Sequence, residues 1–275
     1  MRVYIHTDIE GIAGWAFYAN ADLGSIANYH HTQRMNQLLT NEVVTACRAA
    51  FDAGADEVWV NDAHSYCYSV LFEQLPKRCQ IIHGRPGHFD AWLGHFKTAP
   101  IDALVCVGQH AMAGTPYSVC PHSLWHLVAD GKPMKLSETT MAAALAGSRG
   151  VPCVCVTGDD KICAEVAEKI PGVEPVIVKW AISAQNARSL TPADACDRIY
   201  EGVLAGLGRR EQIAPFALPS PYSINISDRD PTQRILPHDV QGDDFWETVH
   251  RALNSTTYAH FGADPIDDRS FRWPA

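Results

Sequence analysis

The feature that most constrains this chain is a series of short apolar runs that end in carboxylate or histidine residues. The runs at residues 2–5, 58–62 and 104–108 lead to Asp8 and Glu10, to His64, and to His110, respectively. In an open α/β sheet, the loops that leave the carboxyl ends of parallel strands open onto one crevice, so residues far apart in sequence meet there. The pattern predicts a shared site at one edge of a parallel sheet.

The donor atoms of these residues favour a metal site. Two histidines and two carboxylates, joined by Glu138 further along the chain, are donors that suit Zn²⁺ or Mn²⁺ in a hydrolytic centre. Each has an ordinary explanation when taken alone, because short carboxylate motifs and histidines are common in loops. Glu138 also fits the first turn of a helix, where a carboxylate favours the macrodipole. An enzyme follows only if the residues converge.

Strand-like and helix-like patterns alternate along most of the chain. We expect strands at residues 3–7, 57–61, 79–83, 103–107, 151–157 and 176–180, and helices at 33–53, 137–146, 160–170 and 192–207. Gly54 ends the first helix as a C-terminal cap would. This order predicts an α/β fold with a mostly parallel sheet flanked by helices. The prolines at 215, 219 and 221 mark a boundary between a metal-binding catalytic domain, residues 1–212, and a smaller C-terminal α+β lobe, residues 213–275.

Composition excludes several classes of function. The 275 residues are 47% apolar and 19% charged, which is enough to build a large core. Net charge is −9, and the basic residues are scattered, which argues against nucleic acid or an anionic membrane surface as a partner. No apolar run approaches the ~20 residues of a membrane span, and no leader pattern precedes the first strand. We therefore expect a cytoplasmic location.

The nine cysteines are mostly embedded in apolar runs, as buried free thiols are. Cys153 and Cys155 are two apart and would share one face of a regular strand. No second pair with zinc-ribbon spacing accompanies them.

Two further residues are candidates for supporting roles. His122 follows a turn at residues 114–116, so it can fold back over a centre that contains His110. A histidine in the pocket that is not a ligand is a natural proton carrier near neutral pH. Asp62 is placed to orient a ligand histidine.

At these residues the chain resembles the D-aminopeptidase family of metallopeptidases, peptidase family M55. The motifs, in family order, are Asp8-x-Glu10-Gly-Ile-x-Gly, Leu39-Thr-x-Glu42-Val, Ala53-Gly-Ala-x-Glu-Val-x-Val-Asn-Asp-x-His64-Ser, Gly108-x-His110-Ala-x-Ala-Gly-Thr, His122-Ser and Val151-Pro-x-x-x-Val-Thr-Gly-Asp159-Asp160. The resemblance runs from Arg2 to about Pro192.

The resemblance implies two zinc ions per subunit, with Mn²⁺ or Co²⁺ as other metals. The implied ligands are Asp8, Glu10, His64, His110 and Glu138, with Asp8 shared between the ions. His122 matches the family's proposed catalytic histidine, either as nucleophile or as proton shuttle. The resemblance also implies ring-shaped homodecamers, and cleavage of N-terminal D-amino acids from short peptides such as D-Ala-D-Ala.

The chain departs from the family pattern at four places, two of which are an extra residue between His110 and His122 and a scarcely recognisable sequence after Pro215. Residues 135–141 read Lys-Leu-Ser-Glu-Thr-Thr-Met where the family usually has Gly-Glu-x-Gly-Leu-Asn, and residues 66–70 differ from the family's Asn-rich loop. Two alternatives stay open for this reason. One is a metal-dependent amidohydrolase acting on L- or β-aminoacyl peptides or amides, since loops can reshape a pocket on an unchanged scaffold. The other is an inactive metal-binding or structural subunit of an oligomer.

Overall fold

The six strands predicted from the sequence and a seventh that was not predicted form one seven-stranded sheet in a computed structural model, which describes residues 1–17, 26–64, 67–84, 92–225 and 240–256. In sheet order the strands are β3 (Cys79–Ile82), β2 (Glu57–Asp62), β1 (Arg2–Thr7), β4 (Ala103–Gln109), β7 (Cys153–Asp159), β8 (Glu174–Ser183) and β9 (Asn186–Ser189). Neighbouring strands are parallel from β3 to β8, and only β9 runs antiparallel to its neighbour. The predicted α/β fold class is confirmed.

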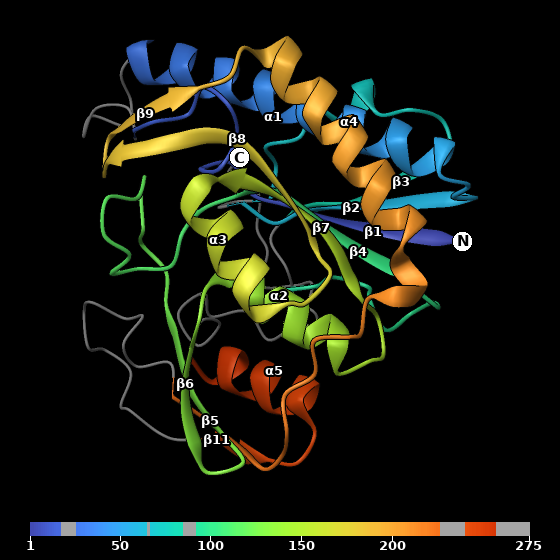
Figure 1. Cartoon of the computed structure of the whole chain (residues 1–275), viewed down its shortest axis with the longest axis vertical. Helices are drawn as coiled ribbons and strands as arrows, with labels where there is room; N and C mark the ends of the chain where they lie inside the picture. The colour runs from blue at the N-terminus through green and yellow to red at the C-terminus, as the bar shows by residue number, and fades with distance from the viewer. Residues whose placement is uncertain (18–25, 65–66, 85–91, 226–239, 257–275) are drawn as a thin grey trace, which may run out of the picture.

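Helices cover both faces of this sheet (Figure 1). On one face, α1 (Ile26–Asp52) lies beside α4 (Pro192–Gly208) and packs on an apolar cluster that includes Ile5, Val105 and Val178. On the other face, α2 (Glu138–Gly147) and α3 (Asp160–Lys169) pack with residues of β4 and β7. Because both faces are covered, β4 and β7 are buried along their whole length, as strands of parallel sheets usually are.

Helix α1 begins earlier than the sequence pattern predicts, at Ile26 instead of about residue 33. Its first turns carry exposed residues such as Ile26 and Tyr29, so the apolar periodicity starts only at Met35. Its end agrees with the prediction, since Gly54 has a φ of +93° and follows the last turn. Among the described helices, including the 27-residue α1, none is both long and apolar enough to cross a membrane.

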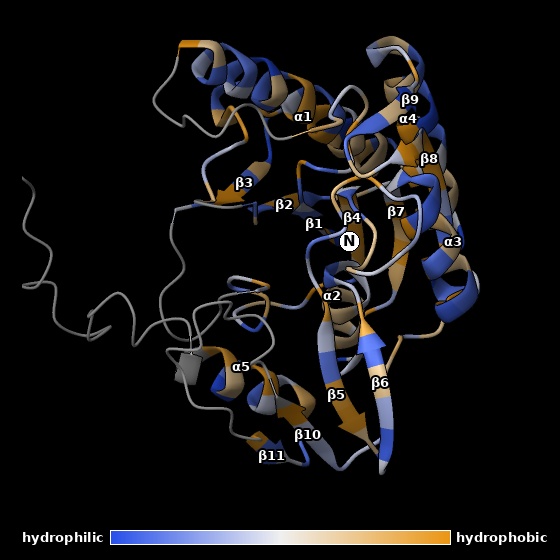
Figure 2. Ribbon diagram, turned by 90° about the vertical axis from the view of Figure 1, so that its left-hand side faces the viewer, coloured by the Kyte–Doolittle hydropathy of each residue, from blue (hydrophilic) through white to orange (hydrophobic). Residues whose placement is uncertain are grey.

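A second, antiparallel sheet packs below the first (Figure 2). Its order is β11 (Val240–Gly242), β10 (Tyr222–Asn225), β5 (Trp125–Ala129) and β6 (Lys132–Leu136), and α5 (Phe245–Thr256) packs against β10 and β11. The sheet therefore joins a hairpin from the middle of the chain to two strands near its end. The domain boundary at residues 212 and 213 stays a prediction, and residues 226–239 and 257–275 of the predicted lobe lie outside the described residues.

The strand order places a reversal between β1 and β4. From β1 the chain builds outward to β2 and β3, then returns to β4 and builds outward to β7 and β8. At such a switch point the loops leaving the two central strands diverge, which opens a crevice at the carboxyl ends of the strands. The loops after β1, β2 and β4 carry four of the five residues predicted to bind metal, and the fifth, Glu138, begins α2.

The cysteines are all free thiols, as predicted. The expectation that Cys153 and Cys155 share one face of their strand is wrong. Leu104 pairs with Cys153 and Val105 pairs with Cys155, so Val154 is an extra residue that forms a bulge. Cys153 consequently belongs to the core beneath α2 and α3, and Cys155 to the core beneath α1 and α4.

Candidate metal centre

The loop after β1 carries the first two carboxylates. A fully extended backbone would aim Asp8 and Glu10 to one face, but the chain bends directly after Thr7, and residues 9–14 form bends and turns. The loop rests on the end of β4, where Asp8 N–H donates to Val107 O (2.9 Å) and Gly11 N–H donates to Gly108 O (2.8 Å). Both carboxylates are nevertheless brought together, almost completely buried at 7% and 1% exposure.

Gly11 permits this close approach of two backbones. A Cβ atom at position 11 would lie 2.0 Å from Gln109 O, a distance that no side chain tolerates. The turn that carries Glu10 therefore depends on a residue without a side chain.

His64, just beyond β2, faces Glu10. Its Nε2 atom lies 3.4 Å from Glu10 Oε1, and its Nδ1 atom lies 3.1 Å from Ser69 Oγ. We predicted that Asp62 orients a ligand histidine. Asp62 acts on His64 only indirectly, through Ser69. Asp62 Oδ2 accepts hydrogen bonds from the N–H groups of Ser69 (2.5 Å) and Val70 (2.7 Å). Asp62 thus holds the segment from which Ser69 reaches His64.

His110, after β4, is the most buried imidazole of the centre. Its Nδ1–H donates to Ala111 O (2.7 Å), and because a carbonyl only accepts, the neutral ring directs the lone pair of Nε2 into the crevice. That Nε2 lies 3.5 Å from Asp8 Oδ2 and 3.8 Å from Glu138 Oε2. It is buried and makes no hydrogen bond, which is the arrangement of a ligand atom directed at a cation.

Glu138 reaches the centre from the other side because α2 begins at that residue. Ser137 caps the helix by accepting a hydrogen bond from Thr140 N–H (3.2 Å), and the hairpin of β5 and β6 delivers this helix start to the crevice. The helix predicted at residues 137–146 is confirmed. The departure from the family pattern at residues 135–141 leaves Glu138 beside His110.

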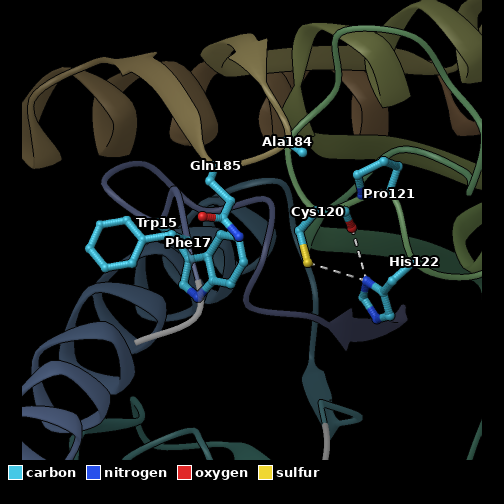
Figure 3. Close-up of a pocket in the computed structure, with 7 residues that line it drawn as sticks. All are labelled: Trp15, Phe17, Cys120, Pro121, His122, Ala184 and Gln185. Atoms are coloured by element: carbon cyan, nitrogen blue, oxygen red, sulfur yellow. Dashed lines mark hydrogen bonds between the residues drawn. The ribbon is translucent and has the colours of Figure 1, made fainter. Parts of the chain in front are cut away.

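His122 lies against His110 at the mouth of the centre. The two rings are stacked, with centroids 4.3 Å apart. Its Nδ1–H donates to Cys120 O (2.9 Å), and Cys120 Sγ lies 3.6 Å from the same nitrogen (Figure 3). Burial by itself lowers the pKa of His122, but the bonds to Cys120 outweigh it, and the pKa is raised above its ordinary value.

The electrostatics of the centre favour a bound cation. Burial raises the pKa of Asp8 well above its ordinary value, and repulsion from the carboxylates of Glu10 and Glu138 adds to the effect. Burial also opposes ionisation of Glu10, but contact with His64 outweighs it and holds the pKa of Glu10 well below its usual range. Three carboxyl groups in so small a buried volume are stabilised in their charged form by a positive ion.

The predicted ligands fall into two adjacent groups, each with ligand atoms within 4.8 Å of one another. One group is Asp8, Glu10 and His64, and the other is His110 and Glu138 together with His122, which was predicted to be catalytic and not a ligand. Carboxylate oxygens with imidazole nitrogens match the donor set of catalytic zinc. His6, which shares the β1 edge, belongs to neither group among the described residues. Its Nδ1 accepts from Asn61 Nδ2 (3.0 Å), and burial lowers its pKa to about 4.

Two supporting residues have no assigned role in the sequence analysis. Ser69 gives no sequence signal, because its contact with His64 depends on the path of a loop. Lys179 does give one, since a lysine inside the apolar strand β8 is unusual. Its Nζ is fully buried and donates to the carbonyl oxygens of Glu10 and Trp15. It fixes the loop after β1 from beneath.

Comparisons with known proteins agree with this geometry. Residues 1–236 match the peptidase M55 model, described as D-aminopeptidase. A D-aminopeptidase from Bacillus subtilis (strain 168) is 31% identical over 230 residues, which cover 82% of this chain and 81% of that protein. The solved structure of the Zn-dependent D-aminopeptidase DppA from B. subtilis, described as a self-compartmentalizing protease, superimposes with a TM-score of 0.80 at 26% identity, covering 96% of this chain and 99% of DppA. The chain belongs to the M55 D-aminopeptidase family of peptide-bond hydrolases.

Proposed function

We propose that this chain is a dinuclear zinc aminopeptidase that removes the N-terminal residue from short peptides, with D-amino-acid peptides as its substrates. The observation that carries the proposal is the pair of adjacent ligand groups at the switch point between β1 and β4. The Zn-dependence of DppA and the shared family support the choice of metal and of substrate.

Asp8, Glu10 and His64 would hold one ion, and His110 and Glu138 would hold the other. Asp8 is suited to bridge them, because its carboxylate lies in the first group and only 3.5 Å from His110 Nε2. Bound zinc supplies Lewis-acid chemistry, polarising the scissile carbonyl and acidifying water. Mn²⁺ or Co²⁺ fits the same donors.

The chain's own residues supply the rest of the chemistry. His122 stands over the second ligand group with its Nδ1 held by Cys120 O, which places its ring beside the reacting amide. There His122 either transfers a proton to the leaving amine or attacks the carbonyl. Ser69 and Asp62 orient the ring of His64, and the Ala111 carbonyl holds His110 in the tautomer that coordination through Nε2 needs.

The assembly and location are part of the same proposal. DppA is described as self-compartmentalizing, and the two chains correspond over nearly their whole lengths. We propose a homo-oligomer, a decameric ring by family resemblance, acting in the cytoplasm. Sedimentation of the purified protein measures the assembly directly.

Metal content per chain is the first test. Elemental analysis of protein purified without chelator should give about two zinc ions, and Glu138→Ala should lower this toward one. Glu247→Ala removes a first-turn glutamate from α5 instead and should leave the content unchanged. One ion or none, unaffected by Glu138→Ala, would contradict the dinuclear site.

A panel of D-, L- and β-aminoacyl peptides and amides tests the substrate class. The proposal expects the highest kcat/KM on D-aminoacyl peptides. A preference for L- or β-aminoacyl substrates would mean that the chain is another metal-dependent amidohydrolase. Two bound ions without turnover of any substrate would mean that it is an inactive metal-binding subunit.

A further inference from the structure

A cavity of about 180 Å³ opens beside His122. Its walls come from three segments: Trp15 and Phe17 in the loop after β1, Cys120 and His122 in the loop before β5, and Ala184 and Gln185 in the turn between β8 and β9. Figure 3 shows Trp15, Phe17 and Gln185 grouped on one side, and Cys120 and His122 on the other. Pockets for drug-sized ligands measure ~300 to 1,000 Å³, so this cavity is sized for a single side chain.

The walls are fixed by contacts between distant parts of the chain. Lys179 Nζ donates to Trp15 O (2.8 Å) and lies 5.4 Å from the centre of the indole, which is itself 3% exposed. The Phe17 ring stacks on His31 of α1, with centroids 5.3 Å apart. The cavity is therefore largely formed before a ligand binds.

A backbone contact ties the remaining two walls together. Cys120 N–H donates to Ala184 O (3.1 Å), so the turn between β8 and β9 stays next to the segment that carries His122. This arrangement sets the cavity against the ring that stacks on His110.

The lining is mostly apolar, and of its described residues only the imidazole of His122 can carry a positive charge. It presents the indole of Trp15, the phenyl ring of Phe17 and the methyl group of Ala184, with the amide of Gln185 as a neutral polar group. Of the lining residues that the structure describes, none bears a carboxylate, ammonium or guanidinium group. A charged side chain that enters the cavity between Trp15, Phe17, Ala184 and Gln185, away from His122, would lose water without gaining an ionic partner, which is costly.

We propose that this cavity receives the side chain of the substrate's N-terminal residue and selects an uncharged, apolar one. This assignment rests on the proposed aminopeptidase function and adds its side-chain specificity. The position supports it, because a peptide held with its scissile bond beside His122 has its N-terminal side chain within reach of the neighbouring wall.

The test uses D-X-Ala dipeptides in which X is alanine, leucine, phenylalanine, lysine or glutamate, with purified, zinc-loaded enzyme. In the wild type, kcat/KM for D-Leu and D-Phe should exceed that for D-Lys and D-Glu by at least about 10-fold. Gln185→Glu should raise the ratio of kcat/KM for D-Lys-Ala to kcat/KM for D-Leu-Ala by about 10-fold. Gln185→Lys should raise the ratio for D-Glu-Ala to D-Leu-Ala by a similar factor. Both gains should shrink at high salt, because they are electrostatic. Gln212→Glu, an exposed substitution outside the cavity, should leave every ratio unchanged.

Phe17→Ala supplies a second, uncharged probe. Because the side chain of Phe17 is half-exposed, we expect this variant to fold. It should lower kcat/KM for D-Leu-Ala and D-Phe-Ala by about 10-fold, while kcat/KM for D-Ala-Ala changes little.

Unchanged ratios in all three cavity variants, with D-Ala-Ala still cleaved, would overturn the cavity assignment and leave the proposed function standing. If the variants change the kcat/KM ratios only in a reciprocal D-Ala-X series, the cavity receives the side chain of the substrate's second residue. That result would overturn the assignment as stated. Failure of the zinc-loaded wild type to cleave any D-aminoacyl peptide would instead overturn the proposed function, and the assignment with it.

Discussion

The imidazole rings of His110 and His122 lie stacked, with centroids 4.3 Å apart and 23° between their planes. Their surroundings differ. His110 is 2% exposed, with its Nε2 directed at the carboxylates of Asp8 and Glu138, whereas His122 is exposed and lines the cavity. One ring is therefore suited to hold a metal ion, and the other to act on a substrate beside it.

His122→Ala tests this division of roles. We expect kcat to fall by about 10²- to 10⁴-fold, because a positioned proton carrier contributes that much, while the metal content per chain stays unchanged. Steady-state kinetics and elemental analysis measure the two quantities on the same sample. His126→Ala, in strand β5, is the matched control and should keep wild-type kinetics. Loss of one ion in His122→Ala would make His122 a ligand.

Ser69→Ala tests the support of His64. Without Ser69 Oγ the Nδ1 atom of His64 loses a hydrogen-bond partner, and the ring is less well oriented. Removing such a partner typically lowers metal affinity by about 10- to 100-fold, so we expect a loss in that range. Competition with a zinc-binding dye measures it. Ser148→Ala, at the far end of α2, is the control and should bind zinc with the affinity of the wild type. Equal zinc affinities in the two variants would show that Ser69 does not support metal binding.

The parts of the fold that follow from local pattern could be predicted from the sequence. Asp8, His64 and His110 were placed correctly at the ends of strands, because the apolar runs before them are short and bounded. The helix predicted at residues 137–146 is α2, which begins at Glu138.

The parts that depend on tertiary contacts could not be predicted. The pairing of β5 with β10 joins segments almost one hundred residues apart in the chain, as Leu127 opposite Ile224 illustrates. The extra residue Val154 in β7 has no local sequence signal, and it reversed the expected facing of the cysteines beside it. The turn that brings Glu10 to Asp8 likewise depends on contact with β4 rather than on an extended backbone.

Gly11→Ala tests that contact. The added Cβ would lie 2.0 Å from Gln109 O. Because this oxygen is a backbone atom and cannot turn aside as the end of a flexible side chain can, the loop after β1 must move. We expect a loss of roughly 1 to 3 kcal/mol in the free energy of unfolding, together with weaker zinc binding. Urea denaturation of the metal-free protein measures the first, and elemental analysis the second. At Gly208, whose φ is likewise not positive, the same substitution meets no atom within 4 Å, so Gly208→Ala is the control without a steric clash. Unchanged zinc binding in Gly11→Ala would show that the loop tolerates displacement.

Glu42→Gln tests a buried carboxyl group that holds the same loop from α1. Burial raises the pKa of Glu42 from 4.5 to about 8, against smaller opposing effects of the Ala13 N–H and of Lys179. The folded state therefore binds this proton more tightly than the unfolded chain does. Its contribution to stability is complete below about pH 4.5 and is lost as the pH rises through about 8.

Glutamine keeps the oxygen that accepts from Ala13 N–H (2.8 Å) but does not ionise. We therefore expect the free energy of unfolding of Glu42→Gln to fall less between these pH values than that of the wild type, with the largest difference at the alkaline end. Urea denaturation at several pH values measures both curves, and Glu211→Gln, at an exposed position, should follow the wild type. Parallel curves for Glu42→Gln and the wild type would mean that Glu42 is already ionised in the folded protein, paired with the ammonium group of Lys179.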